Sequence, residues 1–556
     1  MSYPKKELAQ LVIKYCEAYD ITDIIISPGS RNAPLTIGFT NHSKFKTYSI
    51  VDERSAAFFA LGIAQQKRKP VVVVCTSGSA LLNYYPAVAE AFYSNITLVV
   101  ISADRPKHLI DVGDGQTIRQ ENVFANHIEF SANLDDDGIS IENNAALINK
   151  ALTISKIKKG PVHINVPFDE PLYETVDKAT IQKKIELNES TNKVKEVSMS
   201  ELEPFVEIWN TSSKKMILIG EYFPDEIVQK LLDKLVQDES VLILTETTSN
   251  VHHPKFINSI DNLIFPFDEV QKKEFQPEVL VTFGGMVISK RIKKILRDSK
   301  PAHHWHIGAK RAPDTFHCLS HHFKQNPELF FKQFLTMINP AKSTYQKKWL
   351  TIKSYRENAH TNYLKKCNFS DLKVFDILIK NLPNNVLLQS GNSSVIRYLQ
   401  LFDVKKEVQT FCNRGTSGID GSTSTAIGAS LATNMQTIFM TGDISFFYDS
   451  NALWNNYIKS DFRVILINNS GGGIFRIITG PKNLNSAEYF ETTHNLTAKN
   501  LCDMYHFEYT SVKSEIELKQ SLKGFYNKSN KPRLLEIFTP KNENDIVLKK
   551  YFNYLK

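Results

Sequence analysis

TIFMTGDISFFYDSNALWNNYIKSDFRVILINNSGGGIF, residues 437–475, is the stretch that decides the fold of this chain. It alternates a strand at Thr437–Met440, a turn, a helix, a second strand at Arg463–Ile467 and a second turn. A right-handed crossover lays two such strands parallel in one sheet, with both carboxyl ends at the same edge. We therefore expect Asp443 and Asn469, which follow the two strands, to converge at that edge, where open α/β sheets bind ligands.

The chemistry of this edge is suited to a hard divalent cation. A carboxylate, an amide oxygen and backbone carbonyls are the kind of ligands that Mg²⁺ shares with water and phosphate oxygens. The glycines at 471–473 allow the backbone to approach a ligand closely. A tight turn followed by a glycine-rich loop would explain a lone Gly-Asp, but the Asn-Asn pair after the second strand favours a metal–diphosphate site.

Similar alternation of apolar strands and helices runs outward from this stretch through the whole chain. The expected domains are residues 1–180, 198–340 and 368–556, joined by a polar linker at 177–196 and a charged helical connector at 344–366. Uninterrupted runs such as Val71–Cys75 indicate parallel strands that are buried on both faces. The expected fold class is α/β, with three domains that each hold a central, mostly parallel sheet flanked by helices.

Composition excludes several classes of protein. Hydrophobic residues make up 42% and charged residues 23% of the 556, as in an ordinary globular protein. The net charge of +8 comes without a basic block, so nucleic acid is not an expected partner. No apolar run is long enough to span a bilayer, and the start MSYPKKELAQ has no secretory signal. The six cysteines form no Cys-x-x-Cys pair, so we expect buried, reduced thiols in a cytoplasmic protein.

The spacing of two dipeptides resembles the thiamine-diphosphate motif of the pyruvate-decarboxylase-like enzymes. The first is Gly442-Asp443, and the second, Asn468-Asn469, follows about 25 residues later. The resemblance implies a thiamine-diphosphate-binding fold in the first and third domains. It also implies that Mg²⁺, or Mn²⁺, is held by Asp443, Asn469 and the carbonyl of Gly471. The family usually has glycine where this chain has Ile444, and the spacing here is about one residue shorter. Neither departure touches a metal ligand.

Glu53, in SIVDERSAAFFALGIA, stands where this family carries the carboxylate that protonates the aminopyrimidine ring of the cofactor. A carboxyl in an apolar setting keeps its proton to higher pH, which suits that role. By itself, Glu53 would instead be a helix N-terminal charge that complements the macrodipole, and Asp52 competes for both interpretations. Combined with the metal motif, the catalytic interpretation is favoured.

Five further motifs narrow the resemblance: SPGSRNAPLT at 27–36, ISADRP at 101–106, GQTIRQ at 115–120, GNSSVIR at 391–397 and NRGTSGIDGSTSTAIG at 413–428. Together they are similar to the 2-succinyl-5-enolpyruvyl-6-hydroxy-3-cyclohexene-1-carboxylate synthases of menaquinone biosynthesis. The similarity runs from about residue 20 to 480 and is thin in the central domain, where Ser289-Lys290-Arg291 is the main match. Gly115 replaces the asparagine expected before Gln116, so a contact from that side chain is absent.

Arginine forks bind carboxylates in a bidentate way, and both substrates of these synthases are dicarboxylates. An isolated charged residue is more often a surface or capping residue, and only the joint placement of these residues in motifs favours a site. The resemblance assigns substrate binding to Ser30, Arg31, Arg105, Lys290, Arg291 and Arg414, and catalytic roles to Glu53, Gln116, Ser393 and Arg397. It places the cofactor against Glu53, Gly418, Ile419, Asp443, Ile444, Ser445, Asn469, Ile474 and Phe475.

Two of these assignments have an ordinary packing alternative. Ile419 matches the bulky residue that props the cofactor into its bent form, but a core aliphatic would look the same. Ile474 and Phe475 could equally pack beneath the metal loop. Zinc is a weak interpretation of one further group, because its spacing fits no standard site. That group comprises His303, His304, His306, His317, Cys318, His321 and His322.

The function implied by the resemblance is decarboxylation of 2-oxoglutarate and 1,4-addition of the resulting succinyl carbanion equivalent to isochorismate. Another thiamine-diphosphate 2-oxoacid decarboxylase or carboligase is the first alternative, although it would need an apolar acyl pocket rather than so many arginines. A non-catalytic homologue is the second, although Glu53 and Asp443 are both present. The resemblance also implies a homodimer or homotetramer, in which the first domain of one chain faces the third domain of another.

Overall fold

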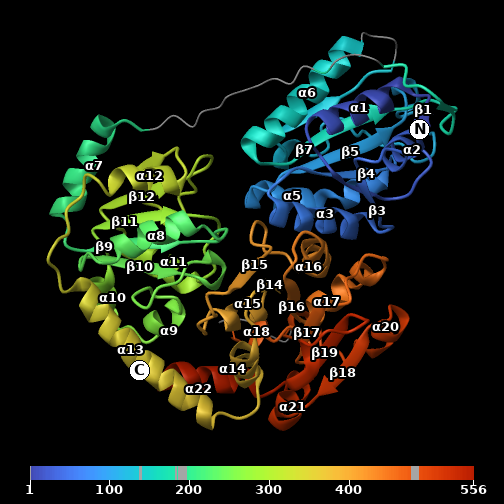
Figure 1. The fold of residues 1–556 in the computed structure, drawn as a ribbon. Helices are drawn as coiled ribbons and strands as arrows, with labels where there is room; N and C mark the ends of the chain where they lie inside the picture. Colours follow the sequence, from blue (N-terminus) through green and yellow to red (C-terminus); the bar gives the residue numbers. More distant parts are fainter. Residues whose placement is uncertain (1, 137–140, 182–184, 186–196, 478–486) are drawn as a thin grey trace.

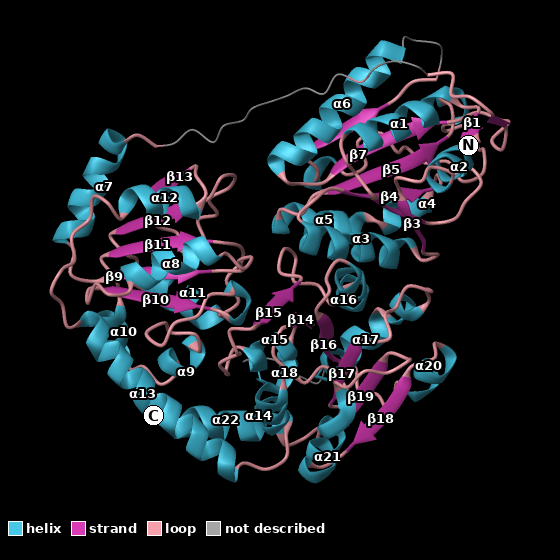
Figure 2. Ribbon diagram, in the orientation of Figure 1, coloured by secondary structure: helices cyan, strands magenta, loops and turns pink. Residues whose placement is uncertain are grey.

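The computed structural model describes residues 2–136, 141–181, 185, 197–477 and 487–556. It contains three parallel sheets in separate lobes (Figures 1 and 2). This confirms the predicted three-domain α/β fold. A small antiparallel pair, β1 (Tyr3–Pro4) with β8 (Thr175–Val176), ties the two ends of the first domain together. In the described ranges, no helix is both long and apolar enough to cross a membrane.

The first domain is built on a six-stranded sheet in the order β3-β2-β4-β5-β7-β6. Helices α3 and α5 cover one face of this sheet, and α1, α2 and α6 cover the other, so its central strands are buried on both sides. The strands are β2 (Asp23–Ile26), β3 (Lys46–Ser49), β4 (Val71–Cys75), β5 (Leu98–Asp104), β6 (Phe130–Asn133) and β7 (Val162–Pro167). The helices are α1 (Glu7–Ala18), α2 (Ala33–Thr40), α3 (Glu53–Lys67), α4 (Ser79–Asn83), α5 (Tyr85–Ser94) and α6 (Ile141–Lys158).

The central domain has a five-stranded parallel sheet in the order β10-β9-β11-β12-β13. Its strands are β9 (Lys215–Ile219), β10 (Val241–Thr245), β11 (Val279–Phe283), β12 (His303–Ile307) and β13 (His321–Phe323). Its helices are α7 (Met199–Thr211), α8 (Glu226–Leu235), α9 (Ile260–Ile264), α10 (Glu269–Phe275), α11 (Lys290–Asp298) and α12 (Pro327–Phe334). The connector predicted at 344–366 is the helix α13 (Tyr345–Lys366).

The third domain has a six-stranded parallel sheet in the order β15-β14-β16-β17-β19-β18. Its strands are β14 (Val386–Ser390), β15 (Val408–Cys412), β16 (Gln436–Gly442), β17 (Arg463–Asn468), β18 (Glu508–Val512) and β19 (Arg533–Phe538). Its helices are α14 (Asp371–Asn381), α15 (Ser394–Leu399), α16 (Ser422–Leu431), α17 (Asp443–Tyr448), α18 (Ile474–Ile477), α19 (Ala487–Glu491), α20 (Lys499–Met504), α21 (Glu515–Phe525) and α22 (Asn544–Tyr554). The two strands predicted in the opening stretch, β16 and β17, are parallel neighbours, as expected.

Three expectations need correction or fall outside the description. The sequence from Ala80 to Tyr93 predicts a single helix, but the chain forms α4 and α5, because Pro86 cannot donate a backbone N–H to a continuous helix. All six cysteines are free as expected, but Cys318 and Cys367 are only partly buried, because they lie in a loop and at a helix end. The linker predicted at 177–196 falls mostly outside the described residues.

Helices α3 and α16 join the first and third domains through direct backbone contact (Figure 1). A Cβ on Gly62 would lie 2.0 Å from the carbonyl oxygen of Thr425, and one on Gly428 would lie 2.0 Å from that of Phe59. Only glycine fits at either position. Side chains of both sheets and both helices therefore form one continuous apolar core.

Candidate active site

The first and third sheets have the same topology. If the six strands of each sheet are numbered along the chain, both have the order 2-1-3-4-6-5, and the direction of the strand order reverses at the same place in each. It lies between β2 and β4 in the first sheet and between β14 and β16 in the third. Ligands bind at the carboxyl edge of such a point, where successive crossovers diverge. The SPGSR and GNSS motifs and Gly442-Asp443 follow β2, β14 and β16, so the predicted site residues start from these edges.

Asp443 is held firmly at the start of α17. Its Oδ1 accepts the backbone N–H of Ile444 at 2.7 Å, and its Oδ2 accepts that of Gly471 at 3.0 Å. His494 Nε2 lies 3.4 Å from the same Oδ2. Burial raises the pKa of Asp443, while the backbone hydrogen bonds and His494 oppose that rise. Ile444, the third-position departure from the family motif, therefore contacts the carboxylate through its backbone N–H.

The side-chain oxygen of Asn469 has no hydrogen-bond partner in the part of the chain that the structure describes. Asn469 Nδ2 donates to Asp371 Oδ2 at 3.0 Å, which fixes the orientation of the amide. Its Oδ1 is buried and accepts no hydrogen bond from the described residues. An orphaned buried acceptor is costly, and a cation would satisfy it. Beside it, Gly471 has φ 138°, and a Cβ there would lie 2.5 Å from the carbonyl oxygen of Glu491. The residues present therefore fit a divalent cation.

Asp52 and Glu53 have different tasks. Asp52 is the N-cap of α3: its Oδ1 accepts the N–H of Ser55 at 3.0 Å and its Oδ2 accepts Asn451 Nδ2 at 2.7 Å. Glu53 is the first residue of the helix and is half-buried. Burial raises the pKa of Glu53, the negative charge of Asp52 adds to the rise, and its own backbone N–H opposes it. A carboxyl with a raised pKa is suited to exchanging a proton near neutral pH.

Predicted substrate residues of the first domain gather near one another. Arg105 Nη1 donates to Ser77 Oγ at 2.7 Å and lies 3.5 Å from the carbonyl oxygen of Gln116. Arg31 is buried, and its Nη1 donates to the carbonyl oxygen of Phe168 at 2.8 Å. Burial and the nearby charge of Arg105 lower the pKa of Arg31. Ser30 adjoins Arg31, and the side chain of Gln116 is exposed in this chain.

A second group of predicted residues lies between the central and third domains. Burial lowers the pKa of Arg397, and the charges of Arg414 and Arg291 lower it further while Asp261 raises it. Arg291, at the start of α11, stacks on the ring of Phe265 at 4.1 Å. Its neighbour Lys290 is exposed, and Ser393, the N-cap of α15, has φ 67°. Three positive charges so close together would attract an anionic ligand.

The first group lies in the first domain, and the second group lies in the central and third domains. Among the residues predicted to bind the cofactor, Ser445 Oγ donates to the carbonyl oxygen of Ile419 at 3.1 Å. In the same segment, Gly418 accepts a hydrogen bond from Asn392, Ile474 is buried at the start of α18, and Phe475 packs against Phe490.

The histidine-rich group of the central domain does not form a metal site. Thr282 Oγ1 lies 2.9 Å from a ring nitrogen of both His304 and His306. His322 Nε2 lies 2.6 Å from the carbonyl oxygen of Gly308. Within the described ranges, no cluster of three or more His, Cys, Asp or Glu side chains could hold a metal ion. The structure therefore does not support the zinc interpretation.

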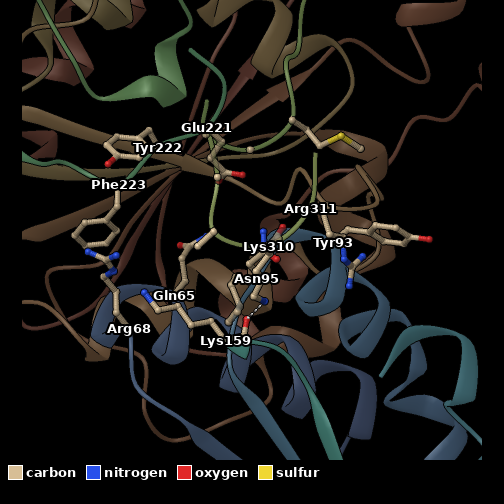
Figure 3. A pocket seen from close by; sticks show the side chains of 18 of the residues that line it. Gln65, Arg68, Tyr93, Asn95, Lys159, Glu221, Tyr222, Phe223, Lys310 and Arg311 are labelled. Atoms are coloured by element: carbon tan, nitrogen blue, oxygen red, sulfur yellow. Dashed lines mark hydrogen bonds between the residues drawn. The ribbon is translucent and has the colours of Figure 1, made fainter. Parts of the chain in front are cut away.

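A cavity of about 620 Å³ lies where the three domains meet (Figure 3). Its lining includes four cationic residues, of which Arg68 stacks on Phe223 at 4.8 Å and Lys310 Nζ donates to the carbonyl oxygen of Lys159 at 2.9 Å. Burial and nearby positive charges lower the pKa of Lys310 to about 8. Neither Asp443 nor Asn469 lines this cavity, so it is separate from the predicted metal position.

Comparison with known proteins decides the family. Residues 6–129 match the family model "Thiamine pyrophosphate enzyme, N-terminal TPP binding domain". The 2-succinyl-5-enolpyruvyl-6-hydroxy-3-cyclohexene-1-carboxylate synthases of Flavobacterium johnsoniae and Flavobacterium psychrophilum are 55% and 56% identical, each over 100% of both chains. That of Christiangramia forsetii is 51% identical, again over 100% of both chains. This chain belongs to that synthase family. It is a thiamine-diphosphate-dependent enzyme, as the sequence predicted.

Membership in the synthase family gives the geometry its context. Three buried polar residues that the sequence did not single out support the predicted ones: Asp371 fixes Asn469, Asn392 holds Arg414, and Glu90 binds the loop beyond Arg414. Asp371 and Glu90 act on residues 98 and 325 positions away, so local patterns could not reveal these two. Asn392 does lie inside the GNSS motif, which was a usable signal.

Proposed function

We propose that this chain decarboxylates 2-oxoglutarate and adds the resulting succinyl unit in a 1,4 manner to isochorismate. The product would be 2-succinyl-5-enolpyruvyl-6-hydroxy-3-cyclohexene-1-carboxylate, the compound named in its relatives. The observation that carries the proposal is the metal position, where the unpartnered Oδ1 of Asn469 lies in the loop that binds Asp443. Full-length identity above 50% to synthases of this name supports the choice of substrates.

Asp443, Asn469 and the carbonyl of Gly471 would hold Mg²⁺ or Mn²⁺, and through it the diphosphate of the cofactor. When bound, thiamine diphosphate supplies the electron sink for decarboxylation and carbon–carbon bond formation. Glu53 would hold and move a proton at the aminopyrimidine ring, since its pKa is raised by burial. Ile419, Ile474 and Phe475 would exclude water from the reacting carbon.

The arginines would bind the substrate carboxylates and orient them. The positive charge of Arg414 lowers the pKa of Arg397, and a substrate carboxylate beside the two would relieve this repulsion. Ser393, the N-cap of the helix that carries Arg397, would orient the acceptor together with Gln116. Arg31 and Arg105 form the equivalent pair in the first domain.

We also propose that the working enzyme is a homodimer or homotetramer in the cytoplasm. The resemblance to this enzyme family supports an assembly in which the first domain of one chain faces the third domain of another. The six free cysteines suit a reducing compartment. The domain bounds of 1–180, 198–340 and 368–556 belong to the same proposal.

The test is direct. The purified chain is incubated with thiamine diphosphate, Mg²⁺, 2-oxoglutarate and isochorismate, and the adduct and the released CO₂ are measured. Replacing 2-oxoglutarate with pyruvate is the control, because a small apolar acyl donor offers no second carboxylate to the arginines. Equal CO₂ release from pyruvate would favour the alternative of a simple 2-oxoacid decarboxylase, and absence of the adduct would contradict the proposal.

A further inference from the structure

Residues 413–419, called here the Arg414 loop, form most of the connection between β15 and α16. The loop carries Arg414 near its start and Ile419 at its end. Ile419 is tied to the helix that begins at Asp443, because its carbonyl oxygen accepts Ser445 Oγ at 3.1 Å. The conformation of this loop therefore sets the place of a residue assigned to substrate and of a residue assigned to the cofactor.

Glu90 binds this loop from another domain. It lies on α5 of the first domain and is 1% exposed. Its Oε1 accepts the backbone N–H of Gly415 at 2.7 Å, and its Oε2 accepts the N–H and the hydroxyl of Thr416 at 2.6 and 2.8 Å. Ser94 Oγ, on the same helix, also donates to Oε1 at 2.7 Å. Bonds to a buried carboxylate are stronger than neutral ones, so three bonds hold the loop against α5.

The contact leaves no room for movement toward the helix. A Cβ on Gly415 would lie 2.6 Å from the carbonyl oxygen of Glu90 and 2.8 Å from Ser94 Oγ. From the other side, Asn392 Nδ2 donates to the carbonyl oxygens of Asn413 and Gly418, both at 2.7 Å. The loop is thus clamped between an asparagine of its own domain and a glutamate of the first domain.

The guanidinium of Arg414 is poised within this clamp. Its Nη1 donates to Asn392 Oδ1 at 2.7 Å, while its buried Nε has no hydrogen-bond partner among the described residues. The N–H groups of Arg414 that do not donate to Asn392 keep their direction only while the backbone of the loop is fixed. Displacement of a binding group by about 1 Å can cost a factor of about 100 in rate.

We propose that Glu90 is a positioning residue, which acts through the Arg414 loop to aim Arg414 at a substrate carboxylate. This role rests on the proposed function, since substrate binding by Arg414 belongs to that proposal. It makes the first domain part of the substrate site of the third domain in the same chain. The motif around Arg414 gave no indication that a residue of the first domain binds this loop.

The first measurement does not depend on activity. Hydrogen–deuterium exchange of the Gly415 and Thr416 amides is compared in the parent, Glu90→Gln and Ser94→Ala. A glutamine side chain has only one acceptor oxygen, so it cannot accept hydrogen bonds from both the Gly415 and the Thr416 N–H groups in the way that the two carboxylate oxygens do. We therefore expect exchange of these amides to speed up by about tenfold or more. Ser94→Ala removes a bond to the same carboxylate that does not involve the loop, and exchange should stay at the parent rate. Unchanged exchange in Glu90→Gln would overturn the anchoring.

The second measurement separates positioning from folding. Glu90→Gln should raise the KM of one substrate by about 10-fold or more, with a smaller change in kcat and the thermal midpoint close to that of Ser94→Ala. In a double-mutant cycle, Glu90→Gln should have almost no further effect once Arg414→Ala is present. Additive effects would overturn the proposal. If Glu90→Gln does not fold, Thr416→Val removes one loop bond and should raise the same KM about fivefold.

The outcomes also distinguish this role from the proposed function. A parent enzyme that makes no adduct from 2-oxoglutarate and isochorismate overturns the proposed function and, with it, the substrate role of Glu90. An active parent in which Arg414→Ala raises a KM but Glu90→Gln does not overturns the role of Glu90 alone. A rise of the same KM in both variants supports it.

Discussion

The side-chain amide of Asn469 donates to Asp371 Oδ2 at 3.0 Å, and these two residues are 98 positions apart in the chain. Asp371 is the first residue of α14, and its other oxygen accepts Thr539 Oγ1 at 2.6 Å. With the nitrogen of the Asn469 amide bound here, its buried oxygen is left without a hydrogen-bond partner among the described residues. One buried carboxylate thus orients the amide that is predicted to bind a cation.

Asp371→Asn should weaken Mg²⁺ binding in the presence of thiamine diphosphate by about 10- to 100-fold, as expected when a residue that orients a metal ligand is lost. The new amide can donate as well as accept, so the Asn469 side chain could turn over. Calorimetric titration with Mg²⁺ is the measurement. Thr539→Val is the matched control, because it removes the bond to Oδ1 of Asp371 and leaves the one to Asn469. Equal losses in both variants would contradict the orienting role.

Asp443→Ala should weaken cofactor binding by about 100-fold or more relative to the parent, which corresponds to about 2.8 kcal/mol. This loss should be larger than that in Asp371→Asn. The reason is that the diphosphate loses its cation bridge as well as the carboxylate. Titration of thiamine diphosphate at saturating Mg²⁺ would measure this loss. Unchanged affinity would show that the metal is held elsewhere.

Glu53→Gln keeps the shape of the side chain but cannot pass a proton to the cofactor ring. Exchange of the C2 proton of bound thiamine diphosphate, followed by NMR without substrate, should slow by about 100-fold or more. Arg397→Ala is the comparison, because it should leave this exchange almost intact and raise a substrate KM by about 10- to 150-fold. Exchange at the parent rate in Glu53→Gln would remove Glu53 from the catalytic role.

Glu221 makes the stability of the fold depend on pH. Burial raises the pKa of its carboxyl to about 8, and the charge of Glu90 adds to the rise. Between about pH 4.5 and 8 the folded chain therefore holds a proton that the unfolded chain has released, so the free energy of unfolding falls as pH rises.

Glu221→Gln mimics the protonated form at every pH. Its thermal midpoint should match that of the parent near pH 5 and exceed it by about 2 °C or more near pH 9. Glu226→Gln, on the exposed start of α8, is the control and should show no such widening. A constant difference between Glu221→Gln and the parent across this range would refute the linkage.

Gly62→Ala should destabilise the junction of the first and third domains by about 1–3 kcal/mol, because its Cβ would meet the carbonyl oxygen of Thr425 at 2.0 Å. Gly524→Ala is the control. Glycine 524 also lies in a helix, α21, but the nearest heavy atom to an added Cβ is 4.0 Å away. That variant should gain up to about 1 kcal/mol from helix propensity. Thermal midpoints of the two variants should move in opposite directions.

The sequence was informative wherever a local pattern carries the physics. Continuous apolar runs marked β4 and the pair β16 and β17, because parallel strands buried on both faces have no polar alternation. The same runs predicted that Asp443 and Asn469 would share an edge, and the N–H of Gly471 bonding to Asp443 agrees with this. The roles given to the arginines remain predictions.

Contacts between distant segments were beyond the reach of these patterns. Asp371 at a helix start looks like a charge that complements the helix dipole, and Glu90 looks like one more charged residue of an amphipathic helix. Only tertiary contact shows that Glu90 binds residues 325 and 326 positions later. The break between α4 and α5 was missed because Pro86 near a helix start is common, and the pattern did not show which helix it starts.

Glu53 and Gly62 lie on the same helix, α3, so the orientation of the first domain against the third affects the position of the Glu53 carboxyl. Nine residues of α3 separate them, a rise of about 14 Å. If the helix crossing at Gly62 acts as a fulcrum, a tilt of about 10° between the first and third domains would swing Glu53 by about 2 Å, since a helix transmits rotation along its length. A displacement of that size exceeds the tolerance of a hydrogen bond. A change in the contact between α3 and α16 at Gly62 would then alter the proposed proton transfer by Glu53 without any change in the Glu53 side chain.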